Sequence, residues 1–275
     1  MSKRVLILLS EHGYWGEELL GPLTELDAAG YESVFVTPTG KRPRALPPSL
    51  DPGYVDPPLG RAVTTPEVAV AARELDESDR LDTPLSLAVL LPERPYASVP
   101  QPLRAMEKYY RDLATATDEP VADYAALVIV GGSGPIVDLA NNGRVHELIL
   151  AFVRADKPVL AECYGVAALA FARDWEDRRS IIWGKHVTGH CKEYDYLDGT
   201  GFLGTDFNMG PPPYPLEYIL RDATGPDGAY HGNVGKEISV IVDHPFVTAR
   251  STPDSFPAGR QLVRVLESGL RRAGW

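Results

Sequence analysis

The sequence has few cysteines, no long apolar run and no cluster of basic residues. Two cysteines in 275 residues are too few for a disulfide framework, so we expect reduced thiols and a cytoplasmic protein. The apolar run at residues 5–9 is shorter than a signal-peptide core, and no window approaches the about 20 apolar residues of a membrane span. A net charge of −11 argues against nucleic acids and anionic membranes as partners.

Signatures of nucleotide and metal sites are also missing. Residues 131–134 form a glycine loop after an apolar run, but neither GxxxxGK[ST] nor GxGxxG is present, and a tight turn that needs positive φ is the better explanation of the glycines. None of the six histidines belongs to an HExxH motif, and Cys191 lacks a CxxC partner. We therefore expect no metal and no cofactor.

Apolar runs alternate with amphipathic segments along the chain. Continuous β-type runs predict buried parallel strands at residues 3–10, 32–37, 124–130 and 158–161, further strand material at 181–189, and a β-hairpin at 238–250. Apolar residues at helical spacing predict helices at residues 17–29, 143–156, 216–221 and 256–272. This alternation predicts one α/β domain over residues 1–275, a flavodoxin-like doubly wound parallel sheet with helices on both faces. Its ligands should lie at the carboxyl ends of the strands.

Residues 41–120 differ in character from the rest of the domain. Residues 38–66 contain eight prolines and no clear period, and a loop of this length inside a compact domain is usually a functional insertion. Helical spacing returns at residues 66–80 and 100–116. We interpret residues 41–120 as a Pro-rich and helical cap inserted within the single domain.

The stretch that organises the remaining chemistry is residues 157–174. An apolar run ends at Cys163 and a helix-like run follows at once, which is the layout of a nucleophile elbow. The N-terminus of the following helix should lower the pKa of the thiol, and the Tyr164 amide with one from residues 131–133 could hold an oxyanion. Free cysteines are often small core residues, but the small residues around the turn make this interpretation as good as that of a buried, inert cysteine.

Partners for Cys163 are less determined. Glu17 and Glu18 follow the first strand, and one of them could reach the thiol, although the helix dipole also favours acids in a first turn. Spacing does not decide which histidine faces Cys163; His190 is the first choice and His12 the second. Aromatic residues suggest a pocket: Tyr14, Trp15, Tyr194, Tyr196, Phe202, Phe207 and Tyr214.

Several motifs in combination resemble the ThiJ/PfpI superfamily, whose fold is like that of class I glutamine amidotransferases. Residues 18–40 resemble its opening E-x-x-x-P … AG(Y/F) … (T/S)P-x-G, and residues 124–134 resemble DYDALVIPGGxG. Residues 158–165 resemble P-V-x-A-x-C-x-G, and shorter matches fall at residues 188–189, 216–217 and 242–255. The size and the insertion look like the larger branch, which includes heat-shock chaperone and glyoxalase-type members.

The resemblance implies roles for individual residues. Cys163 matches the reactive cysteine, Glu18 the acid that hydrogen-bonds it, and the Gly132 and Tyr164 amides the oxyanion site. Tyr164 stands where protease-like and glyoxalase-type members usually have histidine, so the usual Cys-His-acid triad cannot be assembled in that way. The Tyr164 hydroxyl or His190 is then the second acid–base group. Tyr14, Trp15 and Glu217 are expected at the substrate pocket.

Together these features predict a cofactor-independent, cysteine-dependent enzyme that acts on a small electrophilic molecule. Lyase or hydratase chemistry, glyoxalase-like or isonitrile-hydratase-like, is the most concrete version, and a tailoring enzyme of small-molecule biosynthesis is a variant. The alternatives are a stress chaperone or redox sensor, and a peptidase or amidotransferase-type hydrolase. The resemblance also implies a homodimer. It implies no metal site of the kind found in some larger members, because no histidine lies between His12 and His146.

Overall fold

The computed structural model describes residues 3–95, 98–174, 176–195, 212 and 214–275. Its centre is an eight-stranded sheet in the order β12-β10-β11-β7-β6-β1-β2-β5. The strands are β1 (Arg4–Leu8), β2 (Glu32–Thr37), β5 (Leu85–Ser86), β6 (Ala126–Ile129), β7 (Val159–Glu162), β10 (Val240–Asp243), β11 (Phe246–Ala249) and β12 (Arg272–Ala273). All neighbours from β5 to β11 are parallel, and β10 is antiparallel to both β11 and β12. The expected α/β fold with a mostly parallel sheet is confirmed.

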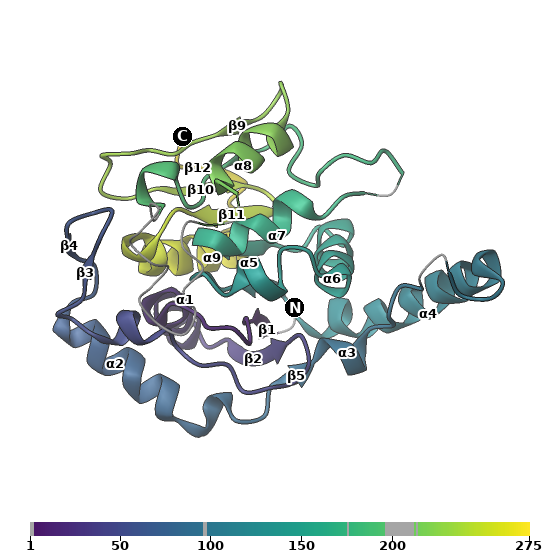
Figure 1. The fold of residues 1–275 in the computed structure, drawn as a ribbon, viewed down its shortest axis with the longest axis horizontal. Coiled ribbons are helices and arrows are strands. Elements are labelled where there is room, and N and C mark those ends of the chain that lie inside the picture. The colour runs from purple at the N-terminus through teal and green to yellow at the C-terminus, as the bar shows by residue number, and fades with distance from the viewer. Residues whose placement is uncertain (1–2, 96–97, 175, 196–211, 213) are drawn as a thin grey trace.

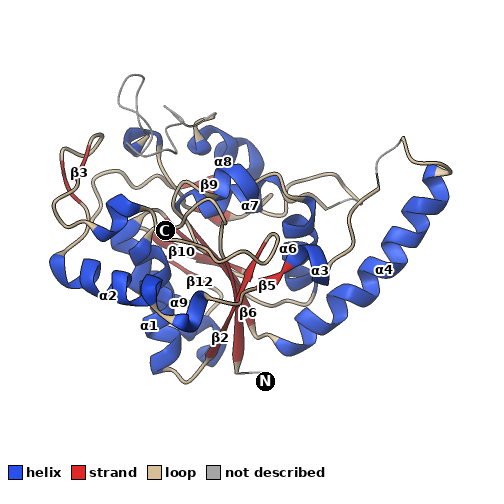
Figure 2. Cartoon of the chain, turned by 60° about the horizontal axis from the view of Figure 1, so that its bottom comes forward, coloured by secondary structure: helices blue, strands red, loops and turns tan. Residues whose placement is uncertain are grey.

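Helices cover both faces of this sheet (Figures 1 and 2). One face carries α1 (Gly16–Ala28), α2 (Pro66–Glu77) and α9 (Ser255–Ser268); the other carries α6 (Gly143–Arg154), α7 (Val166–Phe171) and α8 (Leu216–Thr224). Successive side chains of a strand point to opposite faces. Val5 and Ile7 therefore enter the core on the side of α1, α2 and α9, while Leu6 and Leu8 enter the core on the side of α6, α7 and α8. This two-sided burial explains why the strands read as continuous apolar runs rather than alternating ones.

Local sequence accounts for the ends of the helices. Helix α2 starts after Thr65, whose side chain accepts a hydrogen bond from the Val68 amide, and Pro66 occupies its first position. Asn142 caps α6 in the same way. Helix α9 stops at Ser268 because Gly269 has a left-handed φ of 66°, so the final helix is shorter than predicted and residues 272–273 join the sheet as β12.

Two other segments differ from the sequence predictions. Residues 181–185 form turns rather than a strand, with Gly184 at a φ of 73°. Only β8 (His186–Val187) remains, and it pairs with β9 (Ala229–Tyr230) in a separate two-stranded sheet. The helix predicted at residues 100–116 runs as α4 (Pro102–Asp123), which extends away from the body in both views.

The region predicted as a cap is partly built into the domain. It contributes the hairpin of β3 (Val55–Asp56) and β4 (Arg61–Ala62), then α2, and then β5, which extends the sheet beside β2. The short helices α3 (Leu87–Leu90) and α5 (Pro135–Asp138) complete the described helices. A buried hydrogen bond of 2.8 Å from the Tyr14 hydroxyl to Asp76 Oδ1 ties α2 to the body. None of the helices in the described part of the chain is long and apolar enough to cross a membrane.

Candidate active site

Cys163 lies at the carboxyl end of β7, in a turn that small residues make possible. Its φ of 54° is left-handed, and the 3₁₀ turn Cys163–Gly165 leads directly into α7. A Cβ on Gly131 would lie 2.7 Å from Cys163 Cβ, and one on Gly165 would lie 2.9 Å from the Ile129 carbonyl oxygen. The close approach of backbone at these two glycines therefore shapes the turn and places the thiol above the end of the sheet.

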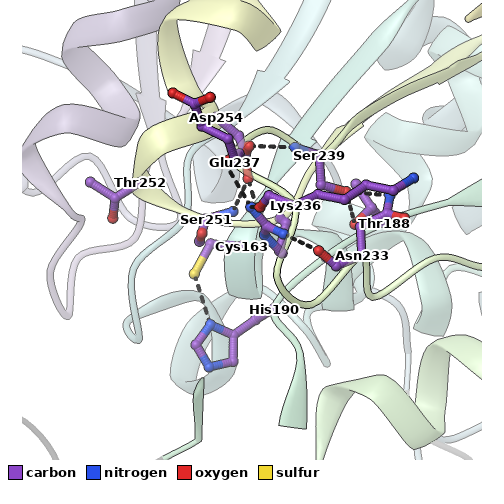
Figure 3. Close-up of polar contacts among 12 residues, drawn as sticks. Cys163, Thr188, His190, Asn233, Lys236, Glu237, Ser239, Ser251, Thr252 and Asp254 are labelled. Atoms are coloured by element: carbon purple, nitrogen blue, oxygen red, sulfur yellow. Dashed lines mark hydrogen bonds and ion pairs between the residues drawn. The ribbon is translucent and has the colours of Figure 1, made fainter. Parts of the chain in front are cut away.

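His190 is the histidine that faces the thiol (Figure 3). Its Nδ1 lies 3.5 Å from Cys163 Sγ, and its Nε2 lies 3.2 Å from Asp195 Oδ1, within ion-pair distance although not aligned as a hydrogen bond. The Tyr164 ring stacks on the imidazole with centroids 4.1 Å apart, and the Tyr164 hydroxyl donates a 2.6 Å hydrogen bond to the same Asp195 oxygen. Cys163, His190 and Asp195 thus lie side by side in that order in space, even though Tyr164 occupies the position directly after the cysteine in the chain.

Glu18 is the acid that lies beside the thiol. It is 2% exposed in the first turn of α1, and Thr252 Oγ1 donates to its Oε1 at 3.4 Å. Burial raises the pKa of Glu18 to about 8, and interactions with the Cys163 thiol and the Gly132 amide oppose part of this rise. Its neighbour Glu17 has a pKa of about 7, raised by burial, and does not line the cavity. At neutral pH Glu18 is therefore mainly a carboxylic acid that can donate a proton.

The protonation state of Cys163 differs from the expectation. Burial first, and then the charge of Glu18, raise the pKa of the Cys163 thiol well above its ordinary value, whereas the Gly132 and Tyr164 amides lower it. The prediction that the following helix makes the thiol acidic is wrong, because the loss of solvation outweighs the local dipoles. Since the resting sulfur is a thiol, its reaction needs a base, and His190 Nδ1 is placed to be that base.

Cys163, His190 and Glu18 line a cavity of about 770 Å³, which Trp15, Gly132, Tyr164 and Tyr194 also line. One wall comes from residues 52–66 and another from residues 235–237 and 250–253. The sequence placed Tyr14 and Glu217 at the pocket, but neither lines it. Tyr14 is 1% exposed and bonded to Asp76, and Glu217 accepts hydrogen bonds from the Lys192 amide and from Arg221.

The other aromatic residues expected at the pocket divide into two groups. Tyr214 packs edge-on against Phe171, with ring centroids 5.6 Å apart, and is not part of the cavity. Tyr196, Phe202 and Phe207 lie outside the described residues. In the part of the chain that is described, no group of three or more metal-type side chains is arranged to hold a metal ion.

Two acids near the site were missed at the level of sequence. Asp195 follows Tyr194, one of the aromatic residues expected at the pocket, but spacing alone could not single it out. Glu162 is 1% exposed; Ser255 Oγ donates to its Oε1 at 2.6 Å, while its Oε2 has no described partner. Burial and the nearby Glu18 charge raise the pKa of Glu162 well above its ordinary value. The sequence did contain one signal for Glu162: it is a charged residue in an otherwise apolar strand, directly before Cys163.

The fold and the site together define a class: an α/β protein with an elbow-like turn that carries a cysteine between a strand and a helix. Comparison with family models matches residues 9–194 to the description "ThiJ/PfpI family-like". The chain belongs to this family, the ThiJ/PfpI or DJ-1/PfpI family, which has the class I glutamine amidotransferase-like fold.

Individual relatives are more distant. Glutamine amidotransferase-like class 1 domain-containing protein 1 of Bos taurus is 30% identical over 142 residues, 52% of this chain and 59% of its own length. Protein/nucleic acid deglycase HchA of Pseudomonas aeruginosa (strain LESB58) is 26% identical over 180 residues, 64% of this chain and 58% of its own length. The matches thus span less than two thirds of either relative.

Solved structures agree over nearly the whole chain. Rapid Encystment Protein 24 KDa of Francisella tularensis aligns with a TM-score of 0.67 at 20% identity, covering 97% of this chain and 99% of the other. Glyoxalase III of Candida albicans aligns with a TM-score of 0.61 at 15% identity, covering 96% and 98%. At these identities the likeness shows the fold alone.

Proposed function

We propose that the protein is a cysteine-dependent enzyme that acts on an electrophilic carbon, with 2-oxoaldehydes as the first substrate class to test. The observation that carries this proposal is the 3.5 Å approach of Cys163 Sγ to His190 Nδ1 in the lining of a cavity of about 770 Å³. The turn at Cys163 acts as a nucleophile elbow in this view. Relatives named as a deglycase and as glyoxalase III support a carbonyl substrate.

The first step is addition of the thiol to the aldehyde. His190 Nδ1 takes the proton from Cys163 Sγ as the sulfur forms a bond to the carbonyl carbon. The electron pair of the C=O bond moves to the oxygen, where the Gly132 and Tyr164 amides stabilise the negative charge. Glu18 gives its proton to this oxygen, which completes a neutral hemithioacetal. Asp195, beside Nε2, stabilises the imidazolium formed on His190.

The later steps need only water as a second reactant. Transfer of a proton from the former aldehyde carbon to the adjacent carbonyl carbon, by way of an enediol, converts the hemithioacetal into a thioester. Water then hydrolyses the thioester, releasing a 2-hydroxy acid and restoring the Cys163 thiol. An isonitrile would undergo the same sulfur addition at its terminal carbon, and hydrolysis would release a formamide. The same residues therefore serve the lyase and hydratase variants of the proposal.

Burial of the thiol favours catalysis over a redox-sensing role. A redox-sensor cysteine needs exposure and a low pKa. Cys163 is 6% exposed, and its pKa is raised by burial. These properties suit a nucleophile that is activated by its own base only when a substrate is bound.

The test is a set of turnover assays over 2-oxoaldehydes and isonitriles. Cys163→Ala should abolish turnover, and His190→Ala should lower it by about 10²- to 10⁴-fold, the usual contribution of a positioned acid–base group. Cys191→Ala is the matched control, because it removes the other free cysteine, which is buried and does not line the cavity. Turnover retained in Cys163→Ala would rule out covalent catalysis by this thiol.

A further inference from the structure

Two polar side chains that line the cavity beside the catalytic groups already have partners within the protein. Arg250 donates hydrogen bonds of 2.6, 3.0 and 3.1 Å to three carbonyl oxygens of the loop at residues 233–237, and its charge is balanced by Asp254, 3.5 Å away. Thr252 donates to Glu18 at 3.4 Å. Because these groups are satisfied without a ligand, a polar substituent on a substrate would gain little from them.

Five further polar residues of the lining offer little more. Trp15, Thr64 and Ser133 line the cavity, but Trp15 Nε1, Thr64 Oγ1 and Ser133 Oγ are buried and cannot contact a ligand. The side chains of Thr65 and Ser251 cap the helical turns that follow them. A ligand therefore meets the side chains of Trp15, Thr64 and Ser133 through carbon atoms alone.

The charged side chains at the more exposed edge of the cavity balance one another. Arg61 lies opposite Asp56 in the β3–β4 hairpin, and Lys236 directly precedes Glu237. Beside the thiol, Glu18 is mainly protonated at neutral pH, because burial raises its pKa to about 8. With no net charge in the lining, a charged ligand would lose its hydration without an opposite charge to compensate, so the lining favours a neutral one.

The β3–β4 hairpin and the residues around it supply an apolar wall. Pro52, Leu59 and Val63 line the cavity and are partly exposed. The turn that carries Leu59 is fixed by two bonds: Asp56 Oδ1 accepts the Leu59 amide at 3.1 Å, and the Asp56 carbonyl oxygen accepts the Gly60 amide at 2.7 Å. Because the wall is formed before a ligand arrives, burying an apolar group against it gains hydrophobic free energy at little ordering cost.

We propose that the cavity takes an uncharged electrophile with an apolar tail of several carbons, and that the β3–β4 hairpin selects this tail. The reactive carbon lies at Cys163, and the tail lies against Pro52, Leu59 and Val63. The volume of about 770 Å³ leaves room for such a tail, since it falls within the range of about 300–1,000 Å³ in which drug-sized ligands are buried. The inference rests on the proposed function, because that function places the reactive carbon at Cys163.

Alkylation of Cys163 by a series of N-alkylmaleimides tests the proposal. The second-order rates with the ethyl, propyl, butyl and hexyl compounds are measured by mass spectrometry, each normalised to its reaction with glutathione. Complete burial of a methylene corresponds to about a fourfold change, so we expect the normalised rate to rise by about two- to fourfold per methylene. Leu59→Asn, which keeps the size of the side chain, and Val63→Ala should lower this increment. Val55→Ala is the matched control, because Val55 lies in the same hairpin, is 55% exposed and does not line the cavity.

A second arm works without the thiol. Calorimetry on the Cys163→Ala protein compares the unreactive N-butylsuccinimide and N-hexylsuccinimide, and the hexyl compound should bind more tightly. Equal rates along the maleimide series, a faster normalised reaction of the charged 6-maleimidohexanoate than of N-hexylmaleimide, or an increment that Leu59→Asn and Val63→Ala leave intact overturns the proposal. If both series rise while the wild type turns over no 2-oxoaldehyde or isonitrile, the catalytic proposal fails and the apolar site stands. Turnover combined with two flat series has the opposite meaning.

Discussion

Replacing Glu18 by glutamine should stabilise the protein increasingly as the pH rises. The reason is that the pKa of Glu18 is about 8 in the fold, compared with 4.5 for an ordinary glutamate, because the carboxyl is buried. Folding at pH 6 or 7 must therefore bind a proton that the unfolded chain has released. For a pKa raised by folding, the stability due to this group is fully present below about pH 4.5 and is lost as the pH rises towards 8.

The size of the change in stability follows from the shift in the pKa of Glu18. Each pH unit between the two pKa values corresponds to about 1.4 kcal/mol, so the full interval from 4.5 to about 8 corresponds to a change on the order of 5 kcal/mol. Glutamine has nearly the same shape and does not titrate. The free energy of unfolding of Glu18→Gln minus that of the wild type should thus increase by about 1.4 kcal/mol per pH unit between about pH 5 and 8.

Urea unfolding at several pH values measures this difference directly. Taking the difference between the free energies of unfolding of the two proteins cancels the contributions of groups that titrate alike in both. Glu74→Gln, which changes an exposed glutamate on α2, is the control and should give a difference that does not vary with pH. If the Glu18→Gln difference is equally flat, Glu18 is not a buried acid with a raised pKa, and its assigned role as proton donor fails with it. If the prediction holds, Glu18→Gln raises the free energy of unfolding and lowers turnover.

Three further variants test the packing and the polar contacts of the site. Gly131→Ala should destabilise by about 1–3 kcal/mol or more in thermal unfolding, because its Cβ would lie 2.1 Å from Glu18 Oε2; Gly143→Ala, with nothing within 4 Å, is the control and should not. Ser255→Ala should cost about 1–3 kcal/mol in urea unfolding, since it removes the donor to the buried Glu162, and an unchanged midpoint would contradict this. Asp195→Asn should slow iodoacetamide alkylation of Cys163 at neutral pH by about 100-fold, the lower end of an acid–base contribution; an unchanged rate would remove Asp195 from the site.

The elements that depend on local chemistry were predictable. Helix α6 follows from the spacing of its apolar residues and from the Asn142 cap, and β1 and β6 follow from continuous apolar runs buried on both sides. Errors arose where the signal is not periodic. Residues 181–185 are apolar enough for a strand, yet they turn around Gly184, and β5 is too short to have a pattern of its own.

The sequence by itself determined that Cys163 follows a buried strand, that a helix comes next, and that Glu18 follows the first strand of the chain. Both strands belong to one parallel sheet with only β6 between them, so their carboxyl ends lie at the same edge of the sheet. The tertiary structure alone decided the rest: that His190 faces the sulfur, that Asp195 and Tyr164 hold the imidazole, and that burial raises the thiol pKa. Contacts between loops depend on the path of the whole chain, and the solvation of a charge depends on everything packed around it. Neither can therefore be derived from the spacing of residues along one segment.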